Sequence, residues 1–333
     1  MELLYPIIIL NSVVGCLGVV LVIADRFLAQ YGDCRIRINE EKKLVVKGGN
    51  SLLASLIDNE IFIPSACGGR LTCGYCQVRV PEGGGPVLPT EEPLLTREQL
   101  MNRYRLACQV KVRQDLKIEI PQEWLAIQRY RAQVISAKPV TPTIKEIMLK
   151  LLEPDSIKFK PGQYVQVKIP TGKSFEYRAY SIASETKYKD RIMLDVRLIE
   201  GGLGSTYLHS LKEGDEVEFV GPYGEFVVKD TDKEIICVAG GVGLCPIRSI
   251  ISSMLDEGTD RKITLFYGVR QKRDLYYYEE LKKLEEKHKN FHFIPALDTP
   301  EPEWEGEVGL VTEVMKRYLT RDGADNMEAY LCG

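Results

Sequence analysis

The stretch CGGRLTCGYC, residues 67–76, is the most informative motif for the fold of this chain. It holds Cys67, Cys73 and Cys76, and Cys108 follows after 31 further residues. Three thiolates on one tight loop with a distant fourth are typical of a [2Fe–2S] cluster, although the plant-type loop is one residue shorter between its first two cysteines. Glycines between the cysteines favour this, because side chains would crowd the sulfides. Structural zinc usually takes two separated cysteine pairs, so zinc is the weaker alternative.

The residues on both sides of this loop predict one small α+β domain of the ferredoxin-like (β-grasp) class, residues 33–121. Two alternating runs, Cys34–Asn39 and Lys43–Lys47, predict a hairpin. Ser51 is expected to cap a helix over Leu52–Asn59. Further strands are expected at residues 77–80, 108–112 and 116–120, with a pair of acidic helices between residues 90 and 104.

An apolar segment precedes this domain. From Leu3 to Ala24 no residue is charged, and such a helix reaches roughly 33 Å, enough to cross a hydrocarbon core of about 30 Å. Basic residues follow the segment but do not precede it, so the positive-inside rule places the later domains in the cytoplasm. A cleaved signal peptide would need a basic start and a small-residue cleavage site. The sequence predicts a single-pass transmembrane helix over residues 3–24, in the cell inner membrane.

Residues 129–230 have the pattern of a small antiparallel β-barrel. Six short strands are expected, at residues 131–136, 144–151, 164–169, 178–182, 192–199 and 216–220. Arg178, Tyr180 and Ser181 stand together, and these side chains can bind a phosphate, a ring face and a ring nitrogen. The glycine turn at 201–206 is expected to open a helix at Tyr207 and to offer N–H groups to a pyrophosphate. Alone each motif is ordinary; together they predict flavin binding, with Gly204, Ser205 and Thr206 at the pyrophosphate.

From Glu234 the rhythm changes to strand, glycine loop and helix, which predicts a parallel nucleotide-binding sheet over residues 231–333. Gly240, Gly241 and Gly243 lie between a strand and a helix, the context in which a dinucleotide phosphate approaches the backbone. Cys332 ends the last expected strand, where a residue over a nicotinamide would lie; a buried structural thiol is the alternative. Arg270 and Arg273 could serve NADH or NADPH equally.

Charge and length agree with this division. The chain of 333 residues is long enough for two or three domains. Its net charge of −3 argues against binding nucleic acid through a broad basic surface, because such binding needs an excess of basic residues. A reducing cytoplasm favours cluster ligands over disulfides for the clustered cysteines.

These motifs, in this order, resemble the ferredoxin-reductase superfamily, and more narrowly the F subunits of the sodium-pumping NADH:quinone oxidoreductase. The resemblance covers essentially the whole chain. It is carried by the N-terminal apolar segment and by CGGRLTCGYCQV (67–78), RLACQV (105–110), RAYSIAS (178–184), SLKEGDEVEFVGPYGEF (210–226) and FYGVRQKRDLYYYEEL (266–281).

The resemblance implies electron flow from NADH through FAD to the [2Fe–2S] cluster, and on to other subunits of a membrane redox complex. Quinone would be reached through these partners, in which any sodium transport would reside. Arg178 would hold the FAD phosphates, Tyr180 would stack on the isoalloxazine, and Ser181 would face flavin N5. Ser205 or Thr206 would bind the pyrophosphate. The three loop glycines would line the NADH phosphates, and Cys332 would lie at the hydride-transfer site.

Two departures from the family pattern matter. The family carries a long insertion before the strand that contains RAYS, whereas here the two neighbouring strands nearly follow one another. The family also continues beyond the equivalent of Cys332-Gly333, so the nucleotide domain is expected to be C-terminally incomplete. Two other functions therefore stay open: the reductase component of an oxygenase system, and a non-catalytic electron-transfer subunit.

Overall fold

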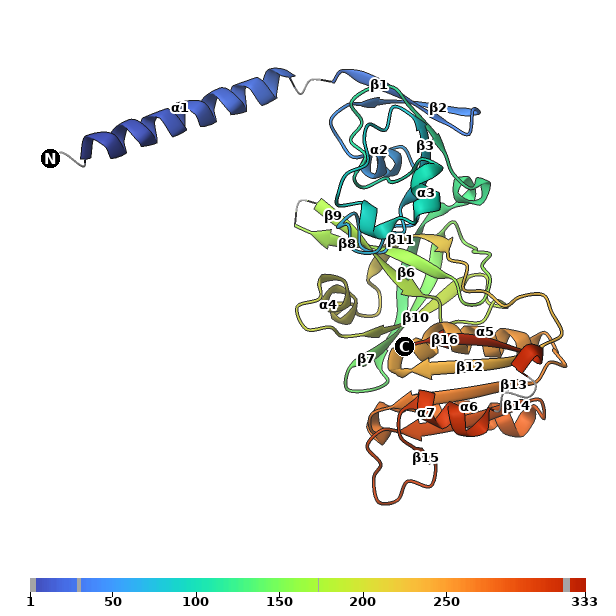
Figure 1. The fold of residues 1–333 in the computed structure, drawn as a ribbon. Coiled ribbons are helices and arrows are strands. Elements are labelled where there is room, and N and C mark those ends of the chain that lie inside the picture. The colour runs from blue at the N-terminus through green and yellow to red at the C-terminus, as the bar shows by residue number, and fades with distance from the viewer. Residues whose placement is uncertain (1–3, 29–30, 173, 320–323) are drawn as a thin grey trace. The chain divides into compact units, whose positions relative to one another are not determined.

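The computed structural model describes residues 4–28, 31–172, 174–319 and 324–333. The chain forms two compact units, Met1–Ala126 and Ile127–Gly333 (Figure 1). The first contains the cysteine loop. The second contains the RAYS motif and the glycine loop at 240–243.

The first unit begins with helix α1, Leu4–Leu28. Several of its apolar side chains are exposed, including Leu10, Val14, Leu17 and Val20. Within the part of the chain that the structure describes, no helix is both long and apolar enough to cross a membrane. The predicted crossing of a bilayer by this segment stays a prediction.

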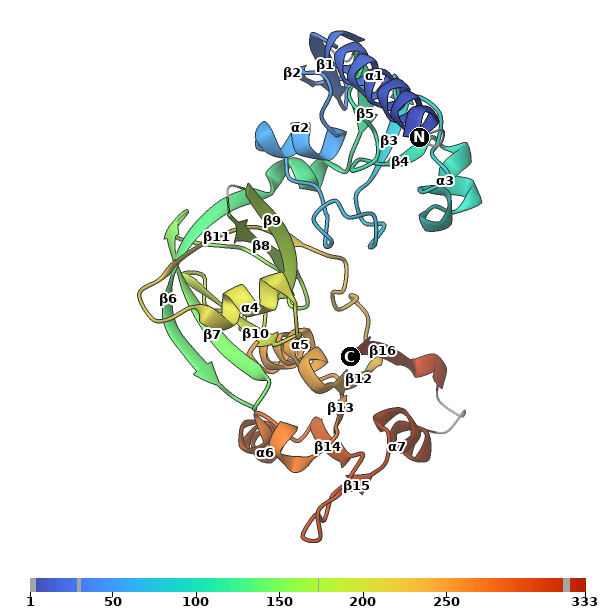
Figure 2. The same cartoon turned by 90° about the vertical axis from the view of Figure 1, so that its left-hand side faces the viewer.

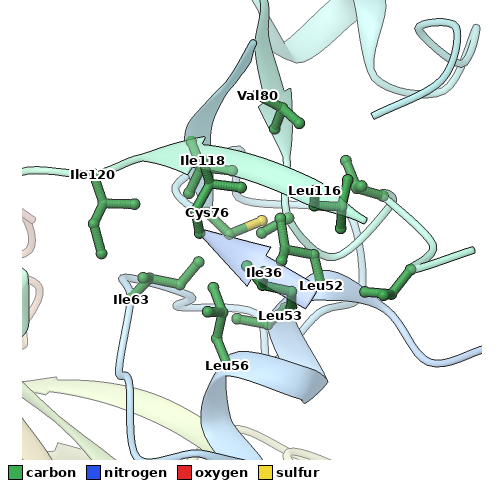
Figure 3. Packing of buried hydrophobic residues seen from close by; sticks show 14 of the residues in the cluster. Ile36, Leu52, Leu53, Leu56, Ile63, Cys76, Val80, Leu116, Ile118 and Ile120 are labelled. Atoms are coloured by element: carbon green, nitrogen blue, oxygen red, sulfur yellow. The ribbon is translucent and has the colours of Figure 1, made fainter. Parts of the chain in front are cut away.

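The rest of the first unit is a five-stranded sheet in the order β2-β1-β5-β3-β4, in which β1 and β5 are parallel. The strands are β1 (Asp33–Ile38), β2 (Lys42–Lys47), β3 (Gln77–Glu82), β4 (Tyr104–Leu106) and β5 (Leu116–Glu119). Helix α2 (Leu52–Asp58) begins at Ser51, whose Oγ accepts from the N–H of Ala54 at 3.2 Å, as the sequence predicts. Its side chains Leu52, Leu53 and Leu56 pack on Ile36 and Ile118 of the sheet (Figure 3).

The acidic segment forms two short turns of helix, η1 (Glu92–Leu94) and α3 (Arg97–Met101), and a third, η2 (Gln122–Ala126), ends the unit. The strand predicted over residues 108–112 is wrong. The N–H groups of Leu52 and Leu53 donate to Val110 and Ala107 carbonyls, at 2.7 and 3.0 Å. Because these carbonyls bond the start of α2, the segment forms a turn, and the strand β4 lies before it.

The second unit starts with six antiparallel strands, as predicted, in the order β10-β7-β6-β11-β8-β9. They are β6 (Gln128–Pro139), β7 (Ile144–Glu153), β8 (Tyr164–Thr171), β9 (Ser174–Ser181), β10 (Arg191–Arg197) and β11 (Glu216–Tyr223). The sheet curls on itself (Figure 2), and the N–H of Ala183, just after β9, donates to Met193 O of β10 at 2.8 Å. This bond joins the two ends of the sheet into a barrel, the flavin lobe.

The remaining residues form the nucleotide lobe, a parallel sheet in the order β15-β14-β13-β12-β16. Its strands are β12 (Glu234–Gly240), β13 (Ile263–Val269), β14 (Phe291–Leu297), β15 (Glu307–Val308) and β16 (Met327–Cys332). Its helices are η3 (Gly241–Gly243), α5 (Leu244–Asp256), η4 (Lys272–Asp274), α6 (Tyr278–Lys287), α7 (Val311–Tyr318) and η5 (Ala324–Asn326). Alternate residues of β12 pack on opposite sides, with α5 and α6 on one face and α7 on the other. The predicted alternation of strand and helix is confirmed; the two-residue strand β15 is too short to leave a pattern in the sequence.

Candidate redox site

The four predicted cluster cysteines come together in two pairs. Cys67 and Cys73, at the two ends of the loop's first half, have sulfurs 3.4 Å apart. Cys76, directly before β3, contacts Cys108 in the turn after β4, where the thiol of Cys76 donates to the sulfur of Cys108. Four thiolates in two pairs match the ligand set of a cluster of two irons. The described residues contain no group of three or more His, Cys, Asp or Glu side chains that could hold a single metal ion.

The backbone of the loop also fits such a cluster. Gly68, Gly69 and Gly74 have φ values of 66°, 86° and 69°, a left-handed conformation that side chains disfavour. A Cβ on Gly69 would lie 3.8 Å from Cys108 Cβ, so this glycine lies beside the second cysteine pair. The N–H of Tyr75 points to Cys73 Sγ at 3.5 Å. Backbone donors therefore face the sulfurs, as a charged cluster requires.

One sulfur in each pair ionises readily. Burial opposes ionisation of Cys67, but N–H groups of Thr72 and Cys73 donate to its sulfur and lower its pKa to about 6. The thiol of Cys76 donates to Cys108 and lowers the pKa of Cys108 to about 7, against the effect of burial. Burial raises the pKa of Cys73, and the hydrogen bond to Cys108 raises the pKa of Cys76. Because the thiolate is the form that binds metal, each pair offers one sulfur that ionises readily and one that must lose its proton on ligation.

A buried ion pair, which was not predicted from the sequence, supports the Cys108 turn. Glu91 and Arg105 are 0% and 4% exposed, with Oε2 and Nη2 2.5 Å apart. Glu91 Oε1 also accepts from the N–H of Leu106 at 2.9 Å, and Arg105 donates to Gly84 O at 2.6 Å. The pair thus fixes β4 two residues before Cys108. The sequence does not distinguish Glu91 from the neighbouring acidic residues, which are typical of an exposed helix.

The predicted flavin residues lie on strand β9 and at the start of helix α4 (Leu203–Ser210). Arg178 pairs with Glu176 and donates to Tyr177 O at 2.8 Å. A Cβ on Gly204 would lie 2.5 Å from the Tyr180 hydroxyl and 2.9 Å from Arg178 Cγ. Only a glycine therefore lets the two side chains lie against the helix start. Burial raises the pKa of Tyr180 to about 12, so its ring stays neutral.

Helix α4 begins earlier than predicted, so Ser205 and Thr206 lie in its first turn. Ser205 is buried and its hydroxyl is used by the loop itself: it accepts from the N–H of Ile199 at 3.1 Å and lies 3.2 Å from Gly202 O. Thr206 is exposed. Gly202, at the N-cap, gives the helix no side-chain cap, so the N–H groups of its first turn remain suited to an anion. Of the two hydroxyls, that of Thr206 is the one available to a phosphate.

The glycine loop of the nucleotide lobe lies against the end of β16. A Cβ on Gly243 would lie 2.1 Å from Cys332 O, and one on Gly240 would lie 3.4 Å from Gly333 Cα. Gly241 has φ 50° and no atom within 4 Å of its would-be Cβ, so its backbone faces open space. Cys332 is half-buried, and burial raises the pKa of its thiol. The structure thus brings the predicted glycines and Cys332 together.

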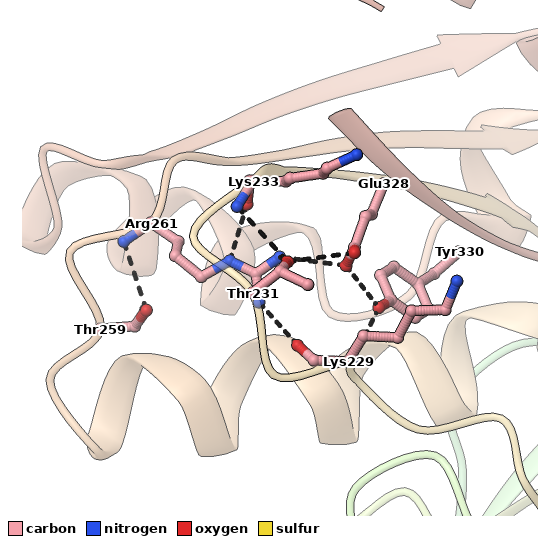
Figure 4. Close-up of polar contacts among 7 residues, drawn as sticks. All are labelled: Lys229, Thr231, Lys233, Thr259, Arg261, Glu328 and Tyr330. Carbon is pink, nitrogen blue, oxygen red and sulfur yellow. Dashed lines mark hydrogen bonds and ion pairs between the residues drawn. The ribbon is translucent and has the colours of Figure 1, made fainter. Parts of the chain in front are cut away.

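A network of hydrogen bonds and an ion pair holds β16 in position beside β12 (Figure 4). Arg261 donates to the carbonyl of Lys233 at 2.7 Å and pairs with Glu328 at 3.2 Å. Glu328 accepts from the hydroxyls of Thr231 and Tyr330, at 3.0 and 3.1 Å. The network ties the segment that enters the nucleotide lobe to the strand that carries Cys332.

Helix α5 joins the two lobes through three donors on one face. Cys245 Sγ donates to Ser181 O at 3.2 Å, Arg248 Nη1 to Ala183 O at 3.0 Å, and Ser249 Oγ to Ser184 O at 2.7 Å. Ser181 therefore meets the helix that begins directly after the glycine loop. These three side chains were not predicted as functional, although their spacing of three and four residues places them on one helix face.

Comparison with known proteins agrees with this geometry. Residues 36–113 match the 2Fe-2S iron-sulfur cluster binding domain, residues 131–228 the oxidoreductase FAD-binding domain, and residues 237–333 the oxidoreductase NAD-binding domain. Among solved structures, a cytochrome P450 reductase of Amycolatopsis shares the fold, with a TM-score of 0.71 at 24% identity over 90% of each chain. A ferredoxin reductase of a carbazole 1,9a-dioxygenase has a TM-score of 0.67 at 23% identity, over the same shares.

Closer similarity is found in sequence. The F subunit of the Na(+)-translocating NADH-quinone reductase of Idiomarina loihiensis is 37% identical over 96% of this chain and 90% of its own length. The corresponding protein of Neisseria gonorrhoeae is 35% identical over 100% of this chain and 93% of its own length. The resemblance inferred from the motifs is confirmed: this chain belongs to the family of the F subunits of the Na(+)-translocating NADH-quinone reductase, with binding domains for a [2Fe–2S] cluster, FAD and NAD.

Proposed function

We propose that this chain is the NADH-oxidising subunit of a membrane redox complex, and that it passes electrons on to partner subunits that reduce quinone. When bound, NADH supplies a hydride, FAD accepts two electrons and can give them up singly, and the [2Fe–2S] cluster accepts one at a time. The observation that carries the proposal is the contact between α5 and the end of β9. It joins Ser181, Cys245 and the glycine loop in one place.

The residues of the flavin lobe would bind FAD and orient its ring system. Arg178, which pairs with Glu176, would supply a positive charge for the FAD phosphates. Tyr180 offers a neutral ring face to the isoalloxazine. Thr206 and the first turn of α4 take the pyrophosphate, while Ser205 holds the loop that presents them. Ser181 would lie beside the flavin ring.

The residues of the nucleotide lobe hold the dinucleotide. Gly240, Gly241 and Gly243 would let its phosphates approach the backbone, which is open to the surroundings at Gly241. Cys332, held beside this loop by β16, would lie at the nicotinamide. No side chain needs to act as a general acid or base, since hydride transfer depends on alignment and exclusion of water. Cys67, Cys73, Cys76 and Cys108 ligate the cluster.

The chain's attachment to the membrane is part of this proposal. Helix α1 exposes apolar side chains along its described length, and burying them in lipid would remove this surface from water. The uncharged run from Leu3 to Ala24 supports a single crossing with the three binding domains in the cytoplasm. If so, the protein stays in the membrane pellet after alkaline carbonate washing, and a variant without residues 1–30 is released. Release of the full chain would refute the anchor.

The function is tested by anaerobic titration of the purified full chain with NADH. Flavin bleaching and the EPR signal of the reduced cluster are followed together. Both are expected to respond, with the flavin first. A protein that reduces its flavin only with dithionite would instead be a non-catalytic electron carrier, and a colourless protein would contradict the whole proposal.

A further inference from the structure

Two carboxylic acids stand directly opposite one another on neighbouring strands of the flavin lobe. Glu146 of β7 pairs across the ladder with Asp195 of β10. Like charges in this position repel one another, and two carboxylates that share a site raise the pKa of one of them. Asp195 is 5% exposed, and its Oδ2 has no hydrogen-bond partner among the described residues. No role in flavin binding accounts for this pair.

A tyrosine of the nucleotide lobe reaches both acids. Tyr277, at the N-cap of α6, has its hydroxyl oxygen 2.6 Å from Glu146 Oε2 and 3.0 Å from Asp195 Oδ1. A tyrosine hydroxyl has a single hydrogen and can donate to one acid only. The other contact is a hydrogen bond only if that acid carries a proton and donates back to the tyrosine oxygen. Both contacts are therefore hydrogen bonds only when one of the acids carries a proton.

The burial of the two acids indicates which one holds this proton. Glu146 is half-buried and makes the shorter contact, as a carboxylate acceptor does. Burial, together with the charges of Glu146 and Glu280, raises the pKa of Asp195 to about 7, against the lowering effects of Arg248 and Tyr277. The other titratable groups that interact with Asp195 are the Cys245 thiol on α5 and the hydroxyls of Tyr267 and Tyr276. Below about pH 7 Asp195 is thus the acid that donates to Tyr277, and Tyr277 donates to Glu146.

The tyrosine itself is held firmly in the nucleotide lobe. The Arg248 guanidinium lies 4.4 Å from the centre of its ring, pairs with Glu280 at 2.7 Å and donates to Ala183 O. The backbone of Tyr277 has φ 58°, a left-handed conformation that a bulky residue rarely adopts. Arg248 lies on the face of α5 that also contacts the end of β9. The hydroxyl of Tyr277 thus connects the two lobes beside the proposed flavin–nicotinamide junction.

We propose that Tyr277 is a positioning residue for hydride transfer: clamped by the Glu146–Asp195 pair through a shared proton, it holds the nucleotide lobe against the flavin lobe. When that proton is lost, both acids can only accept from one hydroxyl, one of the two bonds breaks, and the lobes are held less well. This inference rests on the proposed function, because the clamp matters to the reaction only if NADH reduces the flavin.

The test uses Asp195→Asn in the purified full chain, because an asparagine amide donates to the tyrosine oxygen at any pH. The rate of flavin reduction by NADH is measured by stopped flow from about pH 6 to about pH 9, a range that includes the pKa at issue. In the unchanged protein the rate is expected to fall about two- to tenfold, the worth of one hydrogen bond. Asp195→Asn should remove this fall, and Tyr277→Phe should be slow throughout.

Asp190→Asn is the matched control, since Asp190 immediately precedes β10 and forms a half-exposed ion pair with Arg191. It should keep the pH profile of the unchanged protein. A flat profile in the unchanged protein, or the same slope in Asp195→Asn, would overturn the proposal.

A second measurement does not depend on turnover. Hydrogen–deuterium exchange of the peptide over residues 275–281, corrected for the intrinsic effect of pH, should quicken at alkaline pH in the unchanged protein but not in Asp195→Asn. Equal exchange in both would refute the clamp. If NADH reduces no flavin at any pH, the proposed function fails, and this exchange difference still decides whether the clamp exists.

Discussion

At the scale of single residues, Gly204 has the clearest reason for its identity. Because Gly204 has no side chain, Arg178 and Tyr180 can lie directly against α4. A Cβ added at Gly204 would lie 2.9 Å from Arg178 Cγ. Gly204→Ala must push Arg178 and Tyr180 away from the helix start. We expect the purified variant to carry much less FAD, at least tenfold less if the displacement weakens binding by about 1.4 kcal/mol. The ratio of FAD to protein, measured by absorbance after denaturation, checks this.

Gly243→Ala is the counterpart in the other lobe. The added Cβ would lie 2.1 Å from Cys332 O, a main-chain atom that cannot turn aside. This variant should retain its FAD but lose reduction by NADH, because the glycine loop and β16 must separate. If Gly204→Ala kept full FAD, or if both variants lost it equally, the assignment of α4 to the flavin would be wrong.

At the scale of elements, the turn that carries Cys108 depends on the buried pair Glu91–Arg105. Removing one partner of such a pair costs about 3–5 kcal/mol, because the other charge stays buried. Glu91→Gln should therefore lower the unfolding temperature of the first unit and speed the loss of the cluster's visible absorbance on heating. Glu92→Gln, at the exposed neighbouring position, is the control and should change neither.

The same pair predicts a pH dependence. Burial opposes ionisation of Glu91, but hydrogen bonds from Arg105 and from the N–H groups of Leu88 and Leu106 outweigh it and lower its pKa below the usual 4.5. A lowered pKa means that the pair's stabilisation is complete above about pH 4.5 and is lost as the pH falls through the lowered value. Glu91→Gln should lack this acid-dependent part of the unfolding free energy. An acid profile equal to that of the unchanged protein would contradict the role given to the pair.

Elements whose signal is local could be predicted from the sequence, and elements that depend on distant partners could not. The Ser51 cap, the six barrel strands and the strand–glycine–helix units follow from neighbouring residues, and each is found close to its expected place. The segment 108–112 has an alternating pattern but bonds to α2, which no local pattern reveals. In the same way Glu91, Cys245 and Tyr277 form their hydrogen bonds with residues far along the chain. The roles of these three residues therefore could not be predicted from the sequence.

At the scale of the whole molecule, the division into two compact units separates the cluster from the flavin. All four cysteines proposed as cluster ligands belong to the first unit, and every residue proposed to bind FAD or NADH belongs to the second. Cys76→Ala should therefore abolish the EPR signal of the cluster and leave the rate of flavin reduction by NADH within about twofold, since Cys76 contributes only to the core of the first unit and changes at sites with no shared partners couple weakly. Cys16→Ser, which alters an exposed thiol of α1, is the matched control and should preserve both signals. Loss of both signals in Cys76→Ala would mean that the two units depend on one another to fold, and the step from NADH to flavin would then not be the property of the second unit alone.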